Sequence, residues 1–360
     1  MIEYENLAIA NKKFETLVYE KTKAFIGSGR YVLGDEVSDF ETSFAKYNGV
    51  DHCVGVGNGT DALTIALKAT IEEDGPGEVI VPSNAYIATI LPLIHLGLKP
   101  VLVEPDINTY NIKAEAIIPK LSKNTRAVLV CHMYGRPCEM DDIVSLCRSH
   151  NLQLLEDCSH AHGASYKGKK VGGYGTGAFS FYPTKNLGAM GDAGGITCSD
   201  KALAEKIRAL RNYGSRTKNT VEFVGYSSRL DEFQAAVLNI KLPFLDEINS
   251  HKRGLAEVYF NELGNNFILP VQEKGVECSF HIFAVRHGAR DRLREFLQKN
   301  GTETQVHYPV PPHKQLGMKD VLEGSFPISE EIHQTVLSLP ISFGHNKEDI
   351  HMVCKTMMRF

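Results

Sequence analysis

Apolar and polar positions alternate between two patterns from about residue 50 to residue 200. Short runs rich in β-branched residues predict strands, and most are separated by stretches with the apolar spacing of helices. The predicted strands are residues 54–56, 78–81, 100–103, 127–131, 153–156, 177–182 and 195–198, and the predicted helices among them are residues 61–69, 85–96 and 140–150. Strands that are apolar throughout and separated by helices indicate a mainly parallel sheet covered on both faces. The fold class is therefore α/β, with ligands expected at the carboxyl ends of the strands.

The pattern changes after residue 201. Residues 201–212 and 231–248 each predict one amphipathic helix, and the chain beyond about residue 251 mixes helices with isolated strands such as residues 279–286. We therefore predict a large α/β domain in residues 1–245 and a smaller α+β domain in residues 246–360. A chain of 360 residues is long enough for two domains at roughly 150 residues each.

Composition and charge exclude several classes of protein. The chain has 39 Lys and Arg residues against 43 Asp and Glu residues, a net charge of -4 that predicts no nucleic-acid or membrane partner. The longest apolar stretch, residues 85–98, contains Pro92 and His95 and is shorter than the ~18 residues that span a bilayer. No apolar segment of a secretory signal is visible, so a cytoplasmic protein is expected. The eight cysteines form no CxxC pair, which favours reduced, buried thiols and no metal site.

A glycine-rich segment, residues 55–63 (GVGNGTDAL), follows the first predicted strand. Its glycines let a ligand approach the backbone, and Thr60 or Asp61 is expected to cap the helix that follows. Backbone N–H groups at a helix N-terminus bind anions, phosphate above all. A plain tight turn has the same letters, so this segment alone leaves both interpretations open.

Polar residues also follow two later strands. Asp157 comes at the end of a buried strand, where a carboxylate needs a charge partner. Ser180 lies near the end of another strand, and Lys185 lies in the glycine-bounded loop after it. A half-buried lysine has a lowered pKa, which makes its amine a nucleophile for Schiff-base chemistry. A lone lysine is more often a surface residue, but an anion cradle, a strand-end Asp and a Ser beside a Lys are together the parts of a pyridoxal phosphate (PLP) site.

Three further side chains need an interpretation. Tyr86, after the second predicted strand, is either a flat ring that stacks on a heteroaromatic ligand or part of the core. His160 and His162 lie two residues apart on a loop, without a helix to align them on a metal. We interpret His162 as a core histidine whose hydrogen bonds are satisfied.

Six segments spread over nearly the whole chain form a recognisable set. They are residues 28–34 (SGRYVLG), the GVGNGTDAL segment, residues 156–164 with the pair Glu-Asp and the run AHGA, residues 180–195 (SFYPTKNLGAMGDAGG), residues 210–215 (LRNYGS) and residues 228–236 (SRLDEFQAA). On these segments the chain resembles the DegT/StrS family of PLP-dependent nucleotide-sugar aminotransferases. The resemblance implies the PLP-dependent transferase fold type I, with a mainly parallel seven-stranded sheet in the large domain.

The resemblance implies a role for PLP and for the residues that hold it. Lys185 would be the lysine that bonds the cofactor aldehyde, and Asp157 would keep the pyridine nitrogen protonated. Thr60, a neighbouring amide and Ser180 would hold the phosphate, and Tyr86 would stack on the ring. The full set of implied cofactor residues is Gly59, Thr60, Asp61, Tyr86, Asp157, His160, Ser180, Lys185, Asn186 and Ser227.

Two of these positions depart from the family pattern. His160 stands where relatives usually have Gln near the ring hydroxyl, and its imidazole is able to donate the same hydrogen bond. Ser227 stands where relatives commonly have an Asn that reaches the cofactor phosphate of the other subunit, and serine has a shorter reach. The resemblance also implies a homodimer whose active sites draw on both chains.

Residues 307–315 (HYPVPPHKQ) resemble a segment of enzymes that aminate dTDP-3-keto-6-deoxyhexoses at C3, although a proline-fixed loop explains the local pattern equally well. The implied substrate residues are Tyr182, Arg229, His307, Tyr308 and His313. The implied reaction transfers an amino group from L-glutamate to C3 of the dTDP-linked keto sugar and gives a dTDP-3-amino-3,6-dideoxyhexose.

Three alternatives accompany this interpretation. The first is a C4 aminotransferase of a nucleotide-linked 4-keto sugar. The second is a PLP-dependent sugar dehydratase of the same fold, which Lys185 disfavours because such enzymes typically have His at that position. The third is a non-catalytic PLP-binding regulatory protein, which would keep Asp157 and the phosphate cradle but would need no loop that faces a sugar.

Overall fold

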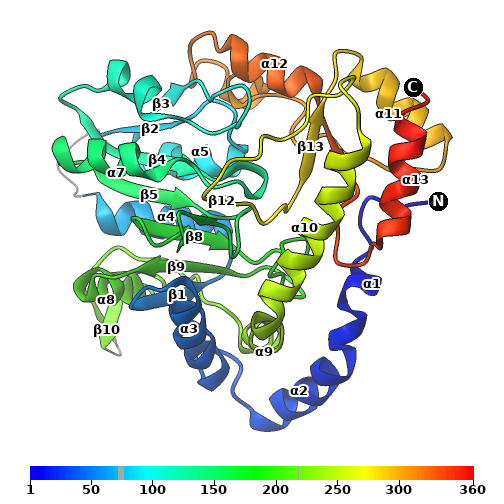
Figure 1. The fold of residues 1–360 in the computed structure, drawn as a ribbon. Helices are drawn as coiled ribbons and strands as arrows, with labels where there is room; N and C mark the ends of the chain where they lie inside the picture. The colour runs from blue at the N-terminus through cyan, green and yellow to red at the C-terminus, as the bar shows by residue number, and fades with distance from the viewer. Residues whose placement is uncertain (72–76, 218) are drawn as a thin grey trace.

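The computed structural model describes residues 1–71, 77–217 and 219–360, and a seven-stranded sheet forms its centre (Figure 1). The order of the strands is β1-β9-β8-β5-β4-β2-β3. Their bounds are β1 (His52–Val56), β2 (Glu78–Pro82), β3 (Lys99–Val103), β4 (Thr125–Cys131), β5 (Gln153–Asp157), β8 (Thr176–Ser180) and β9 (Gly194–Cys198). β9 runs antiparallel to β1 and β8, and the other neighbouring pairs are parallel. The predicted α/β class and mainly parallel sheet are confirmed.

Alternate residues of the strands pack on opposite faces of this sheet. Val79 and Val81 belong to the core on one face, beneath α4 (Gly59–Thr70), α5 (Ile87–His95) and α8 (Lys201–Leu210). Ile80, which lies between them, packs on the other face with α7 (Met140–Ser149). Toward β1 this second face is covered by α3 (Asp35–Asn48) and α9 (Glu232–Lys241). Helices on both faces explain why the strands are apolar throughout.

The remaining helices and strands are shorter or lie outside the central sheet. Their bounds are α1 (Leu7–Asn11), α2 (Glu15–Ser28), α6 (Ala114–Ile117), α10 (Leu245–Glu262), α11 (Arg290–Lys299), α12 (Pro327–Thr335), α13 (Lys347–Met357), β6 (Ser165–Tyr166), β7 (Lys169–Lys170), β10 (Ser215–Thr217), β11 (Thr220–Val221), β12 (Val276–Glu277), β13 (Phe283–Arg286) and β14 (Val336–Leu339). β13 and β14 pair antiparallel in a sheet of their own.

A separate hydrophobic core lies in the C-terminal part, where α10, α11, α13, β13 and β14 meet. Tyr259 stacks on Phe283 at its centre, with the ring centroids 4.6 Å apart. Ile2 packs against this core, and its N–H donates a hydrogen bond to the carbonyl of Gly301 (2.8 Å). The first residues of the chain therefore lie against the range 246–360. The division into domains at residues 1–245 and 246–360 stays a prediction.

Two sequence predictions about this C-terminal half are wrong. Residues 231–248 do not form one helix: α9 ends at Lys241, a 3₁₀ turn (Leu242–Phe244) follows, and α10 begins at Leu245. Pro243 is the reason, because proline lacks an N–H and its ring clashes with the preceding turn of a helix. The strand predicted over residues 279–286 is limited to β13, because Phe280 has a left-handed backbone (φ 44°) that a strand does not accommodate.

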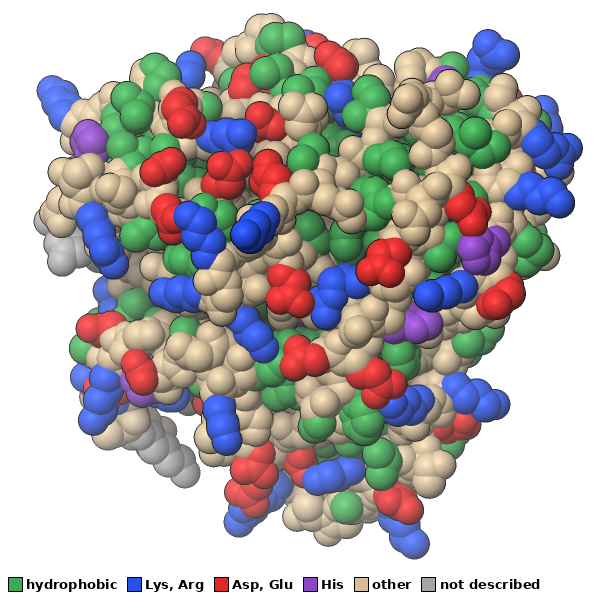
Figure 2. All heavy atoms as spheres, viewed as in Figure 1, with side chains coloured by type: hydrophobic (Ala, Val, Ile, Leu, Met, Phe, Trp, Pro, Cys, Tyr) green, Lys and Arg blue, Asp and Glu red, His purple; other side chains and the backbone are tan. Residues whose placement is uncertain are grey.

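The surface shows no segregation of charge on the face that is drawn, and the cysteines are mostly buried. Acidic and basic side chains are intermingled over the face drawn in Figure 2. Seven of the eight cysteines are buried, and Cys278 is half-buried. Within the described residues, no helix combines the length and the apolarity needed to cross a membrane.

A substitution at Gly177 tests how closely β8 packs. A Cβ atom there would lie 2.5 Å from the Cα of Gly172 and 2.4 Å from Oγ1 of Thr197, so we expect Gly177→Ala to lower the free energy of unfolding by about 1–3 kcal/mol. At Gly27, near the end of α2, a Cβ would meet no atom within 4 Å. Gly27→Ala is therefore the control, and we expect it to be neutral or to stabilise by up to about 1 kcal/mol in the same denaturant titration. Equal stabilities of the two variants would contradict the packing described for β8.

Candidate active site

A cavity of about 550 Å³ lies at the carboxyl ends of the parallel strands. Its wall contains residues at or just beyond the ends of β1, β2, β4, β5 and β8, the edge where ligands of α/β proteins bind. The structure brings ten of the sequence-predicted site residues together there: Gly59, Thr60, Tyr86, Asp157, His160, Ser180, Tyr182, Lys185, His307 and Tyr308.

One side of the cavity is the start of α4. The helix begins at Gly59, and the side chain of Asn58 accepts a hydrogen bond from the N–H of Asp61 (2.8 Å). The expectation that Thr60 or Asp61 caps the helix is therefore wrong, because the helix begins at Gly59 and Asn58 is the N-cap. A Cβ atom at Gly59 would lie 2.5 Å from the Cβ of Ser180. Glycine thus lets the end of β8 meet the helix N-terminus, where unpaired N–H groups favour an anion.

Asp157 ends β5 and is only 5% exposed. Its Oδ2 accepts a hydrogen bond from the Thr89 hydroxyl (2.7 Å), and its Oδ1 accepts one from the backbone N–H of Ser159 (3.0 Å). Both donors are neutral, and the described residues include no ion pair to this carboxylate. A buried carboxylate in such surroundings gains from a cation in the cavity that it faces.

Lys185 is half-buried in the loop after β8, and its side chain lines the cavity. The loop turns tightly there, since the N–H of Lys185 donates to the carbonyl of Tyr182 (2.8 Å). Burial lowers the pKa of Lys185 to about 8, although the negative charge of Asp157 opposes the shift. Near pH 8 about half of this amine is therefore neutral and nucleophilic.

An aromatic wall lies across the same cavity. The rings of Tyr86 and Tyr308 stack with centroids 4.4 Å apart, and the Tyr308 hydroxyl lies 3.2 Å from Nε2 of His160. Tyr86 is 46% exposed, so its ring is not part of the core. Of the two interpretations of Tyr86, the structure favours a ring that is available for stacking.

Five predicted site residues lie outside this cavity. Asp61 accepts a hydrogen bond from the Ser228 hydroxyl (2.6 Å). Ser227 bonds the Tyr213 hydroxyl (3.1 Å) and the guanidinium of Arg229 (3.1 Å), away from the cavity of its own chain.

The other two are buried in hydrogen-bond networks. Asn186 donates to Asn249 and to the carbonyl of Ser279, both at 2.8 Å, and His313 lies 3.0 Å from Oε1 of Glu330. Asn186 and His313 are therefore placed to support loops that line the site.

Three of the cavity-wall residues that were not predicted from the sequence bear on Asp157 and Lys185. Thr89, in the first turn of α5, donates to Asp157, and Cys131, the last residue of β4, lies in the wall beside it. His281 comes from the segment before β13, and its Nε2 lies 3.4 Å from Nζ of Lys185. Cys131 could have been predicted as a site residue from its place at the end of a strand. For His281, nothing in the neighbouring sequence indicates a contact with Lys185.

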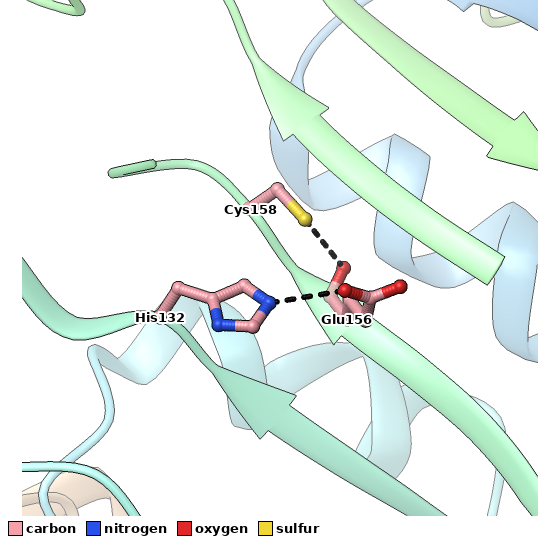
Figure 3. Close-up of side chains that lie close together, drawn as sticks. All are labelled: His132, Glu156 and Cys158. Carbon is pink, nitrogen blue, oxygen red and sulfur yellow. Dashed lines mark hydrogen bonds and ion pairs between the residues drawn. The ribbon is translucent and has the colours of Figure 1, made fainter. Parts of the chain in front are cut away.

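Glu156, the neighbour of Asp157, holds together a buried cluster with His132 and Cys158 (Figure 3). Its carboxylate accepts hydrogen bonds from the backbone N–H groups of Gly172, Tyr174 and Gly175, each at 2.8 Å. His132 accepts the N–H of Cys138 at Nδ1 (3.0 Å), so its Nε2 carries the proton that it donates to Glu156 (3.2 Å). These atoms are engaged in hydrogen bonds, and the cluster fixes the loop around residues 172–175 behind the strand that carries Asp157.

His162 differs from its interpretation as a satisfied core histidine. It is fully buried, 5.5 Å from the rings of Phe179 and Phe181, but neither ring nitrogen has a hydrogen-bond partner among the described residues. His162 is therefore a core residue that packs against two phenylalanines, without the hydrogen bonds that we expected.

Comparisons with known proteins agree along the whole chain. The sequence model of the DegT/DnrJ/EryC1/StrS aminotransferase family matches residues 13–358. The dTDP-3-amino-3,6-dideoxy-alpha-D-galactopyranose transaminase of Aneurinibacillus thermoaerophilus is 46% identical, over 100% of this chain and 99% of that protein. The dTDP-3-amino-3,4,6-trideoxy-alpha-D-glucose transaminase of Streptomyces venezuelae is 44% identical, over 88% of this chain and 84% of that protein.

A solved structure extends the likeness to the fold. The S. venezuelae protein DesV, in complex with a ketimine intermediate, matches with a TM-score of 0.95 and 40% identity over 98% of this chain and 96% of that one. The class of protein that the fold and the family match define is an aminotransferase. Within that class, the chain belongs to the DegT/DnrJ/EryC1/StrS aminotransferase family.

Replacing Glu156 with Gln tests its structural role. Burial raises the pKa of Glu156, but the hydrogen bonds from His132, Gly172 and Gly175 outweigh burial and leave the pKa below its ordinary value. We expect Glu156→Gln to lower the free energy of unfolding at pH 7 by about 1.5–3 kcal/mol, because an amide meets the same donors with one acceptor fewer.

The pH dependence gives a second readout of the same substitution. A carboxylate with a lowered pKa stabilises the fold above its unfolded pKa, roughly 4.3, and this contribution is lost as the pH falls through the lower folded value. The difference between wild type and Glu156→Gln should therefore shrink below about pH 4. The exposed Glu205→Gln, in α8, is the control. A constant difference down to pH 3 would contradict a charged Glu156.

Proposed function

We propose that this chain is a PLP-dependent transaminase that transfers an amino group from L-glutamate to C3 of a dTDP-linked 3-keto-6-deoxyhexose. The observation that carries the proposal is the pair of Lys185 and Asp157 in one cavity at the strand ends. The amine of this pair has a pKa of about 8, and the carboxylate has only neutral donors. The names of the relatives, which are transaminases of dTDP-3-amino sugars, support the substrate class.

The residues of the cavity fit PLP. Asp157 offers a charged acceptor to a protonated pyridine nitrogen, and its buried surroundings make such a partner favourable. The start of α4 at Gly59 and Thr60, beside Ser180, offers N–H and hydroxyl donors to a phosphate. Tyr86 offers the face of an exposed ring. When bound, PLP supplies an electron-accepting ring that stabilises negative charge on the substrate carbon.

Lys185 has two tasks in this proposal. Its neutral amine bonds the cofactor aldehyde, and once released the Nζ atom takes the proton from Cα of the amino donor and later returns a proton to the sugar carbon. Both tasks need an amine that is partly neutral near pH 8, as the pKa of about 8 provides. Asp157 meanwhile keeps the ring nitrogen protonated, and Thr89 and Ser159 hold its two oxygens in place.

The sugar is proposed to lie between Tyr182, His307 and Tyr308, which line the cavity. Arg229 and Ser227 lie outside the cavity of their own chain, next to Tyr213, which is 53% exposed. We infer a homodimer in which this corner completes the site of the second chain. The apolar side chain of Val224, 81% exposed beside it, supports an interface there.

A second candidate function is regulatory binding without turnover. Two relatives have regulatory names: the erythromycin biosynthesis sensory transduction protein EryC1 of Saccharopolyspora erythraea, 39% identical, and the pleiotropic regulatory protein of Geobacillus stearothermophilus, 40% identical. Such a protein would bind PLP and convert no sugar. The loop that carries His307 and Tyr308 lines the cavity and favours the enzyme, since a regulatory protein has no need of a loop that faces a sugar.

A product analysis tests the proposal directly. The full chain is incubated with PLP, L-glutamate and, separately, a 3-keto and a 4-keto dTDP-6-deoxyhexose, and the aminated sugar is identified by NMR. Amination of the 3-keto sugar at C3 is the expected result. Amination of the 4-keto sugar alone would overturn the C3 assignment, and PLP binding with no amination of either sugar would favour the regulatory protein.

Substitution of Lys185 tests its role within that reaction. We expect Lys185→Ala and Lys185→Arg to lose at least about 10³-fold in kcat, because neither side chain bonds an aldehyde or moves the proton at neutral pH. The absorbance of lysine-bound PLP should also vanish in both variants. Lys123→Ala, at an exposed lysine, is the control and should keep the activity. A Lys185→Ala protein with normal turnover would refute the assignment.

A further inference from the structure

His281 lies against the reactive amine and comes from a distant part of the chain. Its Nε2 is 3.4 Å from Nζ of Lys185, at the long end of hydrogen-bonding distance, and both side chains line the cavity. Catalytic hydrogen bonds are often this long before a substrate binds. We propose that His281 is a positioning residue for Lys185: its Nε2 accepts a hydrogen bond from the amine and holds Nζ in the cavity. The inference rests on the function proposed above for Lys185.

Two hydrogen-bonded links tie the His281 segment to the lysine loop. Asn186, the neighbour of Lys185, donates to the carbonyl of Ser279 (2.8 Å). Lys252 on α10 donates to Oδ1 of Asn186 (2.8 Å) and to the carbonyl of His281 (3.3 Å). The backbone on each side of the contact is therefore fixed by buried polar groups, so the approach of His281 to Lys185 is built into the fold.

The backbone before His281 adds a second, independent observation. Phe280 adopts a left-handed conformation (φ 44°), which is costly for a residue with a large side chain. The segment also presses against Gly135, where a Cβ atom would lie 2.6 Å from Oγ of Ser279 and 2.8 Å from the N atom of His281. A backbone conformation held at this cost is typical of functional sites, and here it lies directly before His281.

The protonation state of His281 is consistent with an acceptor. Burial, and then the positive charge of Lys185, keep the pKa of His281 well below its ordinary value, so the ring is neutral near pH 7. A neutral imidazole has one N–H and one acceptor, and the nitrogen that faces the ammonium form of Lys185 has to be the acceptor. The proton therefore lies on Nδ1, which has no hydrogen-bond partner among the described residues.

Nδ1 is itself buried, so the proton on it is enclosed by protein. His281 also lines a space of about 390 Å³ whose wall includes Tyr4, Glu5, Glu303 and His307. With the proton enclosed at Nδ1, exchange to the other tautomer is disfavoured. The imidazole would then keep Nε2 free for Lys185 throughout the reaction.

Other charged and titratable groups also act on Lys185. Asp157, Cys131 and Glu5 raise its pKa, and Lys252 lies close enough for Lys185 to lower the pKa of Lys252 in turn. A hydrogen-bond acceptor at His281 favours the ammonium form over the amine. Removing the acceptor without admitting water should therefore lower the pKa of Lys185 further.

Two substitutions at His281 separate the acceptor from the bulk of the ring. His281→Phe fills the space but accepts no hydrogen bond, and His281→Gln places an amide oxygen near the position of Nε2. Lys185 is labelled with propanal and cyanoborohydride in the full chain purified without added PLP, and its modified peptide is quantified against pH. The wild-type midpoint is expected near pH 8.

We expect the midpoint to fall by about half a unit or more in His281→Phe and to return to within about 0.2 units of wild type in His281→Gln. His287→Gln, at a histidine that bonds Ala289, is the matched control and should not move the midpoint. If His281→Phe does not fold, His281→Leu serves in its place. An unchanged midpoint in the variant without an acceptor, or equal shifts in the Phe and Gln variants, would overturn the inference.

Kinetics in the presence of PLP give a second readout. A misplaced amine should lower kcat by about 10–100-fold in His281→Phe with KM for the keto sugar changed less than about twofold, and His281→Gln should recover most of the loss. Failure of the proposed function has a different signature: wild type itself would then show no transamination, while the labelling midpoints would still report on the contact. A normal kcat in His281→Phe would contradict the inference alone.

Discussion

The candidate site depends above all on the free-energy cost of burying the charged amine of Lys185. An ammonium ion loses much of its hydration when it is buried, and here the loss lowers the pKa of Lys185 to about 8. The carboxylate of Asp157 limits this cost without removing it, because Thr89 and Ser159 already occupy its oxygens. The result is an amine that exists in both protonation states near neutral pH. An amine that both bonds an aldehyde and carries a proton needs that balance.

The geometry of the sheet brings these groups together. Parallel strands end at one edge, so Asp157 on β5 and Ser180 on β8 meet there although 23 positions separate them in the chain. The side chain of Glu156 points to the opposite face of the sheet from that of Asp157. There its carboxylate accepts hydrogen bonds from the loop near Gly172. Adjacent acids on one strand therefore have separate tasks, one toward the cavity and one toward the support behind it.

The sequence was sufficient for the strands of the central sheet and for several of the residues at their ends, although it missed Cys131 at the end of β4. Strand-end positions such as Asp157 and Ser180 are local signals, because apolar runs predict strands and strands of an α/β fold share an edge. His281 and Asn186 had no such signal, since their roles come from contacts between segments about 95 residues apart. The break at Pro243 was visible in the letters, but the apolar spacing on either side of it suggested one continuous helix. The roles of the ten residues in the cavity stay predictions, although the structure places those residues together.

One consequence concerns motion between the two parts of the chain. α10 begins directly after the Pro243 turn, and its first turns carry Asn249 and Lys252, which hold Asn186. The same helix ends in the C-terminal core around Tyr259. Because one helix contacts both, the C-terminal part is coupled to the loop that bears Lys185. A swivel near residue 245 would therefore displace Lys185 together with its loop.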